Sequence, residues 1–263
     1  MMKLLSNRDR MISVILGAIS IAAVLWLWEW LSHLRLSSGV ELPGPSVVAI
    51  RAWQLRSELG WELLLTLKRA FLGLLIATLT MVPLGLAIGR IQGLARVLGP
   101  VIEILRPLPT PAIIPFVMLL AGVSDSAKIA IVFYGVMFPI LLSSISSVGS
   151  IHPTTVNAAR SVRLTVPERF LFVYLPAAFP QIAAGIRTSI PVALLVGVTA
   201  EMLLSTDGLG VFLRQKQESF QMADGLAGII VLAVCALLIN RINLWSEHKL
   251  LFWHYGQTEA RDS

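Results

Sequence analysis

The sequence predicts an all-α membrane protein of about six transmembrane helices. Of its 263 residues, 56% are hydrophobic and only 14% are charged, whereas soluble domains usually have about 25% charged residues. The mean hydropathy is +0.79, and the apolar residues gather in long runs. Because the charged coat of a soluble protein is missing and a bilayer is crossed by about 20 apolar residues, most of the chain is expected to face lipid.

The first expected span covers 11–28, which is 18 residues without a charge. Lys3, Arg8 and Arg10 precede it, as in a signal peptide. The apolar run is longer than the usual ~7–15 residues of a signal peptide, however, and no small-residue cleavage site follows it. We therefore expect an uncleaved membrane helix.

Five further spans are expected at 70–89, 108–123, 129–148, 180–204 and 226–244. The span at 108–123 is expected to begin earlier, near Val97. Before the second span, the sequence Leu-Pro-Gly-Pro-Ser at 42–46 has turn chemistry and is expected to open an amphipathic external helix. Residues 11–246 would thus form one transmembrane domain between cytoplasmic tails at 1–10 and 247–263.

The distribution of basic residues excludes one class of partner and orients the chain. The net charge is +6, but the 21 Lys and Arg residues are scattered between apolar stretches, with no basic run suited to nucleic acid. With the N-terminus in the cytoplasm, the inner segments hold eleven of these residues and the outer segments eight. The positive-inside rule then favours cytoplasmic N- and C-termini.

A loop at 150–175, between the fourth and fifth spans, is expected to form a helical hairpin. Pro153 can start one short helix and Pro167 a second, with Thr165 near the cap position. The two helices would be joined at 163–165. Such a hairpin can dock into a groove on another protein, although a surface loop without a partner would have the same sequence features.

Seven residues of this region have a recognisable spacing: Asn157, Ala158, Ala159, Arg163, Val173, Leu175 and Pro176. The pattern resembles the cytoplasmic signature of binding-protein-dependent ABC permeases, which reads Glu-Ala-Ala, three residues, Gly, nine residues, then Ile, any residue, Leu and Pro. Asn157 replaces the usual Glu and Arg163 the usual Gly. Because Gly is favoured where a turn needs positive φ, we expect the turn at Arg163 to be built differently.

Other stretches are similar to the nitrate, sulfonate, taurine and bicarbonate branch of these permeases. They keep their order along the chain and lie at 42–46, 69–73, 83–89, 105–109, 138–141, 200–202 and 208–210. The resemblance implies the type I importer fold in a bacterial inner membrane, with surrounding lipid. It also implies a second permease copy, two cytoplasmic ATP-binding cassette ATPase subunits that contact the seven signature residues, and an extracytoplasmic solute-binding protein.

The chain itself is not expected to be an enzyme or to need a cofactor. It contains no Gly-x-x-x-x-Gly-Lys-[Ser/Thr] loop, with which ATPases hold phosphates. ATP and magnesium would therefore be bound by the partner subunits.

Four ionisable residues at or near membrane depth are candidates for the translocation path, since such residues cost roughly 2.5–3.5 kcal/mol to insert. Arg106 precedes three prolines within 107–111 and either lines a solute path or forms a structural pair with Glu103, three residues away. Arg187 lies within the fifth span and Glu201 near its outer end. For these two, a structural role as an ion pair or helix cap is favoured slightly over solute contact.

The expected function is the import of a small solute, foremost an organic or inorganic anion such as a sulfonate, nitrate or bicarbonate. An uncharged heterocyclic nutrient is the alternative solute. A different mechanism, ion-coupled secondary transport, would also use a broken helix near the membrane midplane. It is less favoured, because the break at 107–111 has no paired counterpart in the second half of the sequence.

Overall fold

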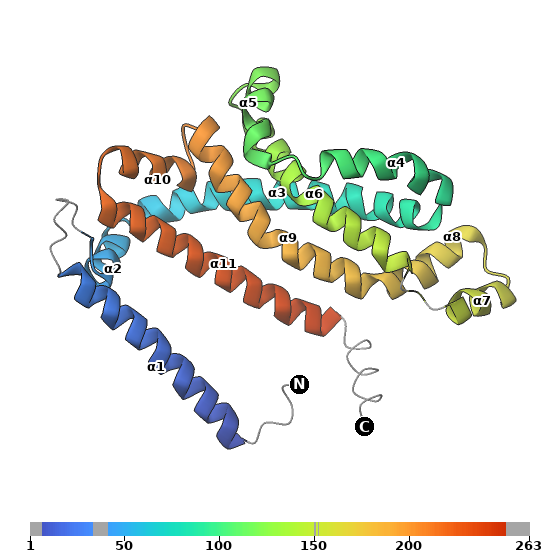
Figure 1. The fold of residues 1–263 in the computed structure, drawn as a ribbon, viewed down its shortest axis with the longest axis horizontal. Coiled ribbons are helices and arrows are strands. Elements are labelled where there is room, and N and C mark those ends of the chain that lie inside the picture. The colour runs from blue at the N-terminus through green and yellow to red at the C-terminus, as the bar shows by residue number, and fades with distance from the viewer. Residues whose placement is uncertain (1–6, 34–41, 150, 152, 251–263) are drawn as a thin grey trace. The chain divides into compact units, whose positions relative to one another are not determined.

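The computed structural model describes residues 7–33, 42–149, 151 and 153–250, and all regular structure in these ranges is helical (Figure 1). The helices are α1 (Asn7–Ser32), α2 (Pro45–Gln54), α3 (Arg56–Arg90), α4 (Gln92–Leu105), α5 (Thr110–Ala121), α6 (Asp125–Gly149), α7 (Pro153–Ser161), α8 (Val166–Arg169), the π-helical η1 (Phe170–Tyr174), α9 (Leu175–Leu204), α10 (Leu209–Glu218) and α11 (Met222–Leu250). The predicted fold class is confirmed.

Five segments are long and apolar enough to cross a membrane: α1, α3, α6, η1 continued by α9, and α11. The third expected span, 108–123 with its start near Val97, is broken. Helices α4 and α5 pass the same test only as a pair, and they are bent by 96° at the break between them. Prolines at this break lack an amide donor and cannot continue the preceding helix. The expected count of six therefore holds when the bent pair is one span.

The spans differ from the expected ranges mainly at their starts. Helix α3 begins at Arg56 rather than at residue 70, because its first turns are amphipathic and escape a search for apolar runs. Helix α9 begins at Leu175 rather than at 180. Pro176 is the second residue of α9, and it does not end the helical segment, which runs on from η1 without a break. The helix expected to open after the turn at 42–46 is α2, which begins at Pro45.

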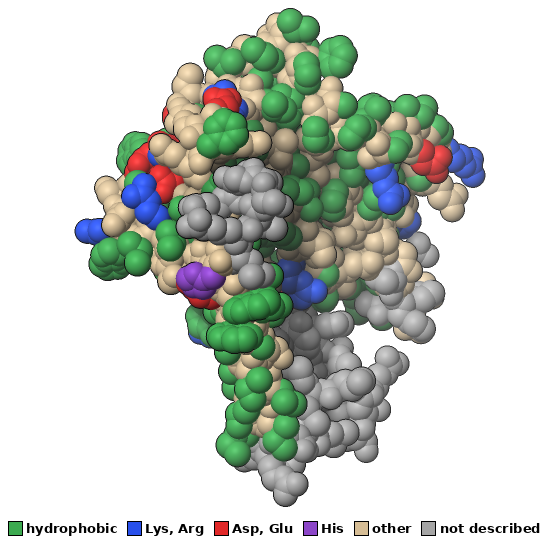
Figure 2. All heavy atoms as spheres, turned by 60° about the vertical axis from the view of Figure 1, so that its left-hand side comes forward, with side chains coloured by type: hydrophobic (Ala, Val, Ile, Leu, Met, Phe, Trp, Pro, Cys, Tyr) green, Lys and Arg blue, Asp and Glu red, His purple; other side chains and the backbone are tan. Residues whose placement is uncertain are grey.

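The chain forms two compact units, and α3, α10 and α11 contribute residues to both. The first unit contains the described parts of 1–59 and 213–231. In it, the indole N–H of Trp28 donates to the Pro43 carbonyl at 3.1 Å, and Glu29 accepts the backbone N–H and side-chain O–H of Ser46. These bonds fix the end of α1 to the start of α2. Hydrophobic side chains cover the surface along α1 (Figure 2), as expected for a helix that faces lipid.

The second unit contains the described parts of 60–212 and 232–263, and its core is the packing of α3, α6 and α9. Small residues let these helices approach closely. A Cβ atom at Gly85 of α3 would lie 2.8 Å from the Leu141 carbonyl oxygen of α6. A Cβ atom at Gly185 of α9 would lie 2.5 Å from the Cβ of Ser143 on α6. The three helices are therefore in near backbone contact.

Candidate functional site

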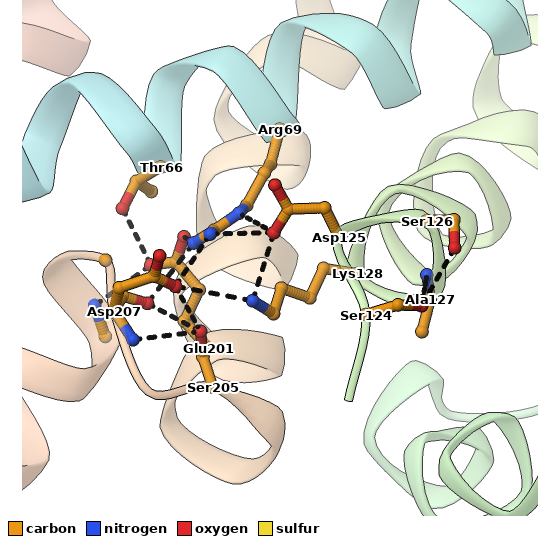
Figure 3. A network of polar contacts seen from close by, with 12 residues as sticks. Thr66, Arg69, Ser124, Asp125, Ser126, Ala127, Lys128, Glu201, Ser205 and Asp207 are labelled. Carbon is orange, nitrogen blue, oxygen red and sulfur yellow. Dashed lines mark hydrogen bonds and ion pairs between the residues drawn. The ribbon is translucent and has the colours of Figure 1, made fainter. Parts of the chain in front are cut away.

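A network of charged side chains joins α3 to the start of α6 and the end of α9 (Figure 3). Its centre is Arg69 on α3, whose side chain is only 2% exposed. The guanidinium forms ion pairs with Asp125 at 2.8 Å and Glu201 at 2.8 Å. A third pair, at 2.7 Å, joins it to Asp207 in the segment after α9. Because a buried charge is tolerated only when it is paired and hydrogen-bonded, these three carboxylates explain how Arg69 can be buried.

Lys128 on α6 is the second cation of the network. Its ammonium nitrogen lies 3.2 Å from Asp125 and 3.4 Å from Asp207. Both carboxylates are about half exposed, so the network reaches the surface of the chain on their side. Partial burial raises the pKa of Asp207, but hydrogen bonds from Arg69 and Ser205 outweigh it and hold this pKa below its usual value.

Glu201 is fully buried, and both of its oxygens accept hydrogen bonds. Besides the pair with Arg69, it accepts the Thr66 O–H at 2.7 Å and the Gly210 N–H at 3.1 Å. Gly208 has a φ of +102°, and a Cβ atom there would lie 2.4 Å from the carboxyl carbon of Glu201. Only glycine therefore lets the chain fold around this carboxylate.

We call this set the Arg69 network, and it comprises Thr66, Arg69, Asp125, Lys128, Glu201, Ser205 and Asp207. Three of the stretches that carried the family resemblance, at 69–73, 200–202 and 208–210, meet in it. The geometry supports a structural role for Glu201, which pairs with a cation and holds the first turn of α10 through Gly210.

Sequence reasoning missed the partners of Glu201, because it counted Arg69 and Lys128 only as charges outside the spans. One local signal could have identified Arg69. Thr66 and Gly73 stand three and four residues from it and share one helical face with it. A Cβ atom at Gly73 would lie 2.7 Å from the Cβ of Val132 on α6. Arg69 thus lies on the face that meets the other spans.

Arg106 lies at the break between α4 and α5 and lines a hollow of about 400 Å³. Thr110, Tyr134 and Phe138 are also in its wall. The Tyr134 hydroxyl donates to the Leu105 carbonyl oxygen at 2.8 Å. This bond supplies a partner to a carbonyl at the broken helix end, as irregular backbone at membrane depth requires.

The two alternatives for Arg106 differ in whether Glu103 neutralises it. Neither residue forms an ion pair with any other residue in the described ranges, and the Arg106 side chain is exposed. The pair with Glu103 is therefore absent from this conformation. Arg106 presents its charge at a hollow that has polar groups from a threonine and a tyrosine.

Arg187, the remaining candidate, is paired. Its guanidinium lies 3.0 Å from the carboxylate of Glu247 on α11, and Glu247 is only 8% exposed. The pair ties α9 to α11. As for Glu201, the geometry supports a structural role, and these two candidates are not brought together with Arg106 at one site.

The expected helical hairpin is formed by α7, α8 and the turn between them, and we call residues 153–169 the signature hairpin. Arg163 has a φ of +59°, the left-handed conformation that favours glycine. The Leu164 N–H donates to the Ala159 carbonyl at 3.3 Å, which is the bond of a Schellman motif, with Arg163 in the position usually held by Gly. The expectation of a differently built turn is wrong: Arg163 takes up the strained backbone conformation instead.

The second helix of the signature hairpin is capped as expected. The carboxylate of Glu168 accepts both the backbone N–H and the side-chain O–H of Thr165, each at 2.7 Å. The two bonds lower the pKa of Glu168. This is one half of a capping box, which fixes the turn at the start of α8.

The signature residues differ in how accessible they are. Asn157, Ala158, Arg163 and Pro176 are exposed, whereas Val173 and Leu175 are half-buried. Ala159 is only 6% exposed, because it faces its own chain. Direct contact between Ala159 and a partner was expected, and in this conformation the neighbouring Ala158 offers the accessible surface.

Comparison with known proteins identifies the family. The sequence profile of the family "Binding-protein-dependent transport system inner membrane component" matches residues 81–251, more than half of the chain. The taurine transport system permease protein TauC of Escherichia coli is 29% identical over 94% of this chain and 91% of its own length. The nitrate import permease protein NrtB of Synechococcus elongatus is 26% identical over 84% of each chain.

One more relative and one solved structure are similar to the chain. The putative aliphatic sulfonates transport permease protein SsuC of Bacillus subtilis is 29% identical over 90% of this chain and 87% of its own length. A chain of the MetNI methionine ABC transporter, in an inward-facing conformation, aligns with a TM-score of 0.55 at 16% identity. It covers 80% of this chain and 98% of its own. That likeness concerns the fold alone.

Proposed function

The chain belongs to the binding-protein-dependent transport system inner membrane component family and is an ABC importer permease, and we propose that it forms the path for a small anion. Membership of this family sets ion-coupled secondary transport aside, because the family is defined by dependence on a binding protein.

The observation that carries the anion proposal is the unpaired charge of Arg106 at its hollow. A fixed cation attracts an anion most strongly where water is scarce, and the Thr110 hydroxyl in the same wall can donate a hydrogen bond. The curated relatives are named for taurine, aliphatic sulfonates and nitrate, all of which carry an anionic group. A sulfonate, nitrate or bicarbonate fits this site better than an uncharged heterocycle.

The proposed partners are a second copy of the chain, two ATPase subunits and a solute-binding protein. Exposed apolar side chains on α4 and α5, among them Ile104, Leu119 and Leu120, offer a surface for a second copy. The signature hairpin offers the exposed Asn157 and Ala158 to an ATPase. We propose that the chain itself catalyses no reaction, since ATP would be hydrolysed on the ATPase subunits.

We further propose that the N- and C-termini lie in the cytoplasm. Supporting this, Arg69 of α3, the start of α6 and the end of α9 meet in the Arg69 network, whereas the signature hairpin joins the opposite ends of α6 and α9. With the hairpin on the ATPase side, the Arg69 network faces outward, which agrees with the excess of basic residues in the inner segments.

The test is reconstitution of the chain with the ATPase and the binding protein of its transporter. ATP hydrolysis in proteoliposomes would be measured with a panel of sulfonates, nitrate, bicarbonate and uncharged heterocycles. We expect stimulation by one or more anions. Stimulation by heterocycles alone would contradict the anion assignment, and the absence of any ATPase coupling would contradict the importer assignment.

A further inference from the structure

The junction between the signature hairpin and α9 contains a π-helical turn. Residues Phe170–Tyr174 form η1, which follows α8 directly and continues into α9 at Leu175. Such turns are rare and recur at functional sites. Because no loop separates α8 from α9, any displacement of the hairpin reaches α9 through the backbone.

The last residue of this turn also contacts another span. Tyr174 is 9% exposed, and the guanidinium carbon of Arg90 lies 5.6 Å from the centroid of its ring. Arg90 is the final residue of α3. A guanidinium within about 6 Å of an aromatic ring is attracted to it, so this stack joins the end of α3 to the end of the turn.

The stack lies at the end of a continuous apolar seam between α3 and α9. Leu86 of α3 packs with Ala178 and Ile182 of α9. On the other side, α3 lies close to α6, since a Cβ atom at Gly89 would lie 2.7 Å from the Ile145 carbonyl oxygen. The ends of α3, α6 and α9 therefore pack as one body, and Tyr174 is where the hairpin enters it.

We propose that Tyr174 and Arg90 form the joint through which displacement of the signature hairpin moves α3 together with α9. The inference rests on the proposed function, in which an ATPase subunit displaces the hairpin. Neither residue touches solute or nucleotide, so both are positioning residues. Without the aromatic ring the hairpin still pulls α9 through the backbone, but α3 is held only by the apolar seam.

The test compares matched variants in the complex of permease, ATPase and binding protein in proteoliposomes. The quantity measured is the ratio of solute-stimulated to basal ATP hydrolysis. We expect Tyr174→Leu and Arg90→Gln each to lower this ratio about two- to fivefold, the factor to which a cation–π contact corresponds. Tyr174→Phe keeps the ring and Arg90→Lys keeps the charge, so both should stay near the unaltered chain. The double variant Tyr174→Leu/Arg90→Gln should be no worse than either single one.

A distance measurement separates a joint from a merely stabilising contact. Spin labels at Ile91 and Val162, both exposed, would be introduced as cysteines in a Cys235→Ala chain. With the joint intact, the separation of the two labels should be the same with and without ATP. In Tyr174→Leu this separation should change when ATP is added.

An undiminished stimulation ratio in both Tyr174→Leu and Arg90→Gln would overturn the inference. So would a separation in Tyr174→Leu that ATP leaves unchanged. If the unaltered complex shows no solute-stimulated hydrolysis, the proposed function fails first, and the inference with it.

Discussion

Arg69 and Arg106 are both arginines on spans, and their surroundings are opposite. Arg69 is buried among three carboxylates from two other parts of the chain. Arg106 is exposed at a hollow and pairs with no carboxylate in the described ranges. A buried arginine that is already paired with carboxylates cannot also bind an anionic solute. An unpaired arginine at a hollow can. The partners of a membrane arginine, rather than its depth, therefore indicate whether it stabilises the fold or binds a solute.

The largest effect is expected for Arg69→Leu. The change leaves Glu201 buried without its cation, and breaking a buried pair in this way costs about 3–5 kcal/mol. We expect the variant to lose most of its monodisperse protein on size-exclusion chromatography in detergent and to melt well below the unaltered chain. Lys68→Gln, at the exposed neighbouring position, is the matched control and should behave normally. A stable Arg69→Leu protein would show that the network does not hold the spans together.

The paired state of Arg69 could not be predicted from the sequence, because its partners Glu201 and Asp207 stand 132 and 138 residues away. The broken span could be predicted, since prolines act locally on the backbone. The signature hairpin could be located because its two helix starts have local signals. The burial of Ala159 could not, because it depends on how α7 packs on its own chain.

A smaller loss is expected for Arg187→Gln. Glu247 is buried but Arg187 is about one third exposed, so solvent screens part of the interaction and we expect about 1–2 kcal/mol. Thermal unfolding in detergent would measure it, with Arg241→Gln, at an exposed position on α11, as the control. Equal loss in both variants would mean that the pair with Glu247 contributes nothing specific.

A gain is expected for Arg163→Gly. The left-handed conformation costs a non-glycine residue roughly 1–2 kcal/mol, and glycine removes most of this strain while adding entropy to the unfolded chain, so the net gain should be about 1 kcal/mol. Slower proteolysis within the signature hairpin would report it. Arg163→Ala removes the same side chain without relieving the strain, and a gain of the same size there would contradict the explanation.

The smallest effect is a pH dependence at Asp207. The pKa of Asp207 in the folded chain lies below the usual value of an aspartate, so its contribution to stability is present above that usual value and is lost as the pH falls through the lowered pKa. Melting temperatures of the unaltered chain and of Asp207→Asn should therefore differ near neutral pH and converge under acid conditions. A difference that stays constant down to pH values of about 3 would exclude a charge contribution.

The contrast between the two arginines is tested most directly by uptake of an anionic solute in proteoliposomes that contain Arg106→Gln. Because Arg106 pairs with no carboxylate among the residues that the structure describes, we expect normal assembly and melting but uptake reduced about tenfold, the factor that 1.4 kcal/mol of lost binding corresponds to. Arg106→Lys should recover part of it, since the charge remains without the planar fork. Normal uptake by Arg106→Gln would contradict the account. So would a loss of assembly that Glu103→Gln restores, because it would reveal the structural pair instead.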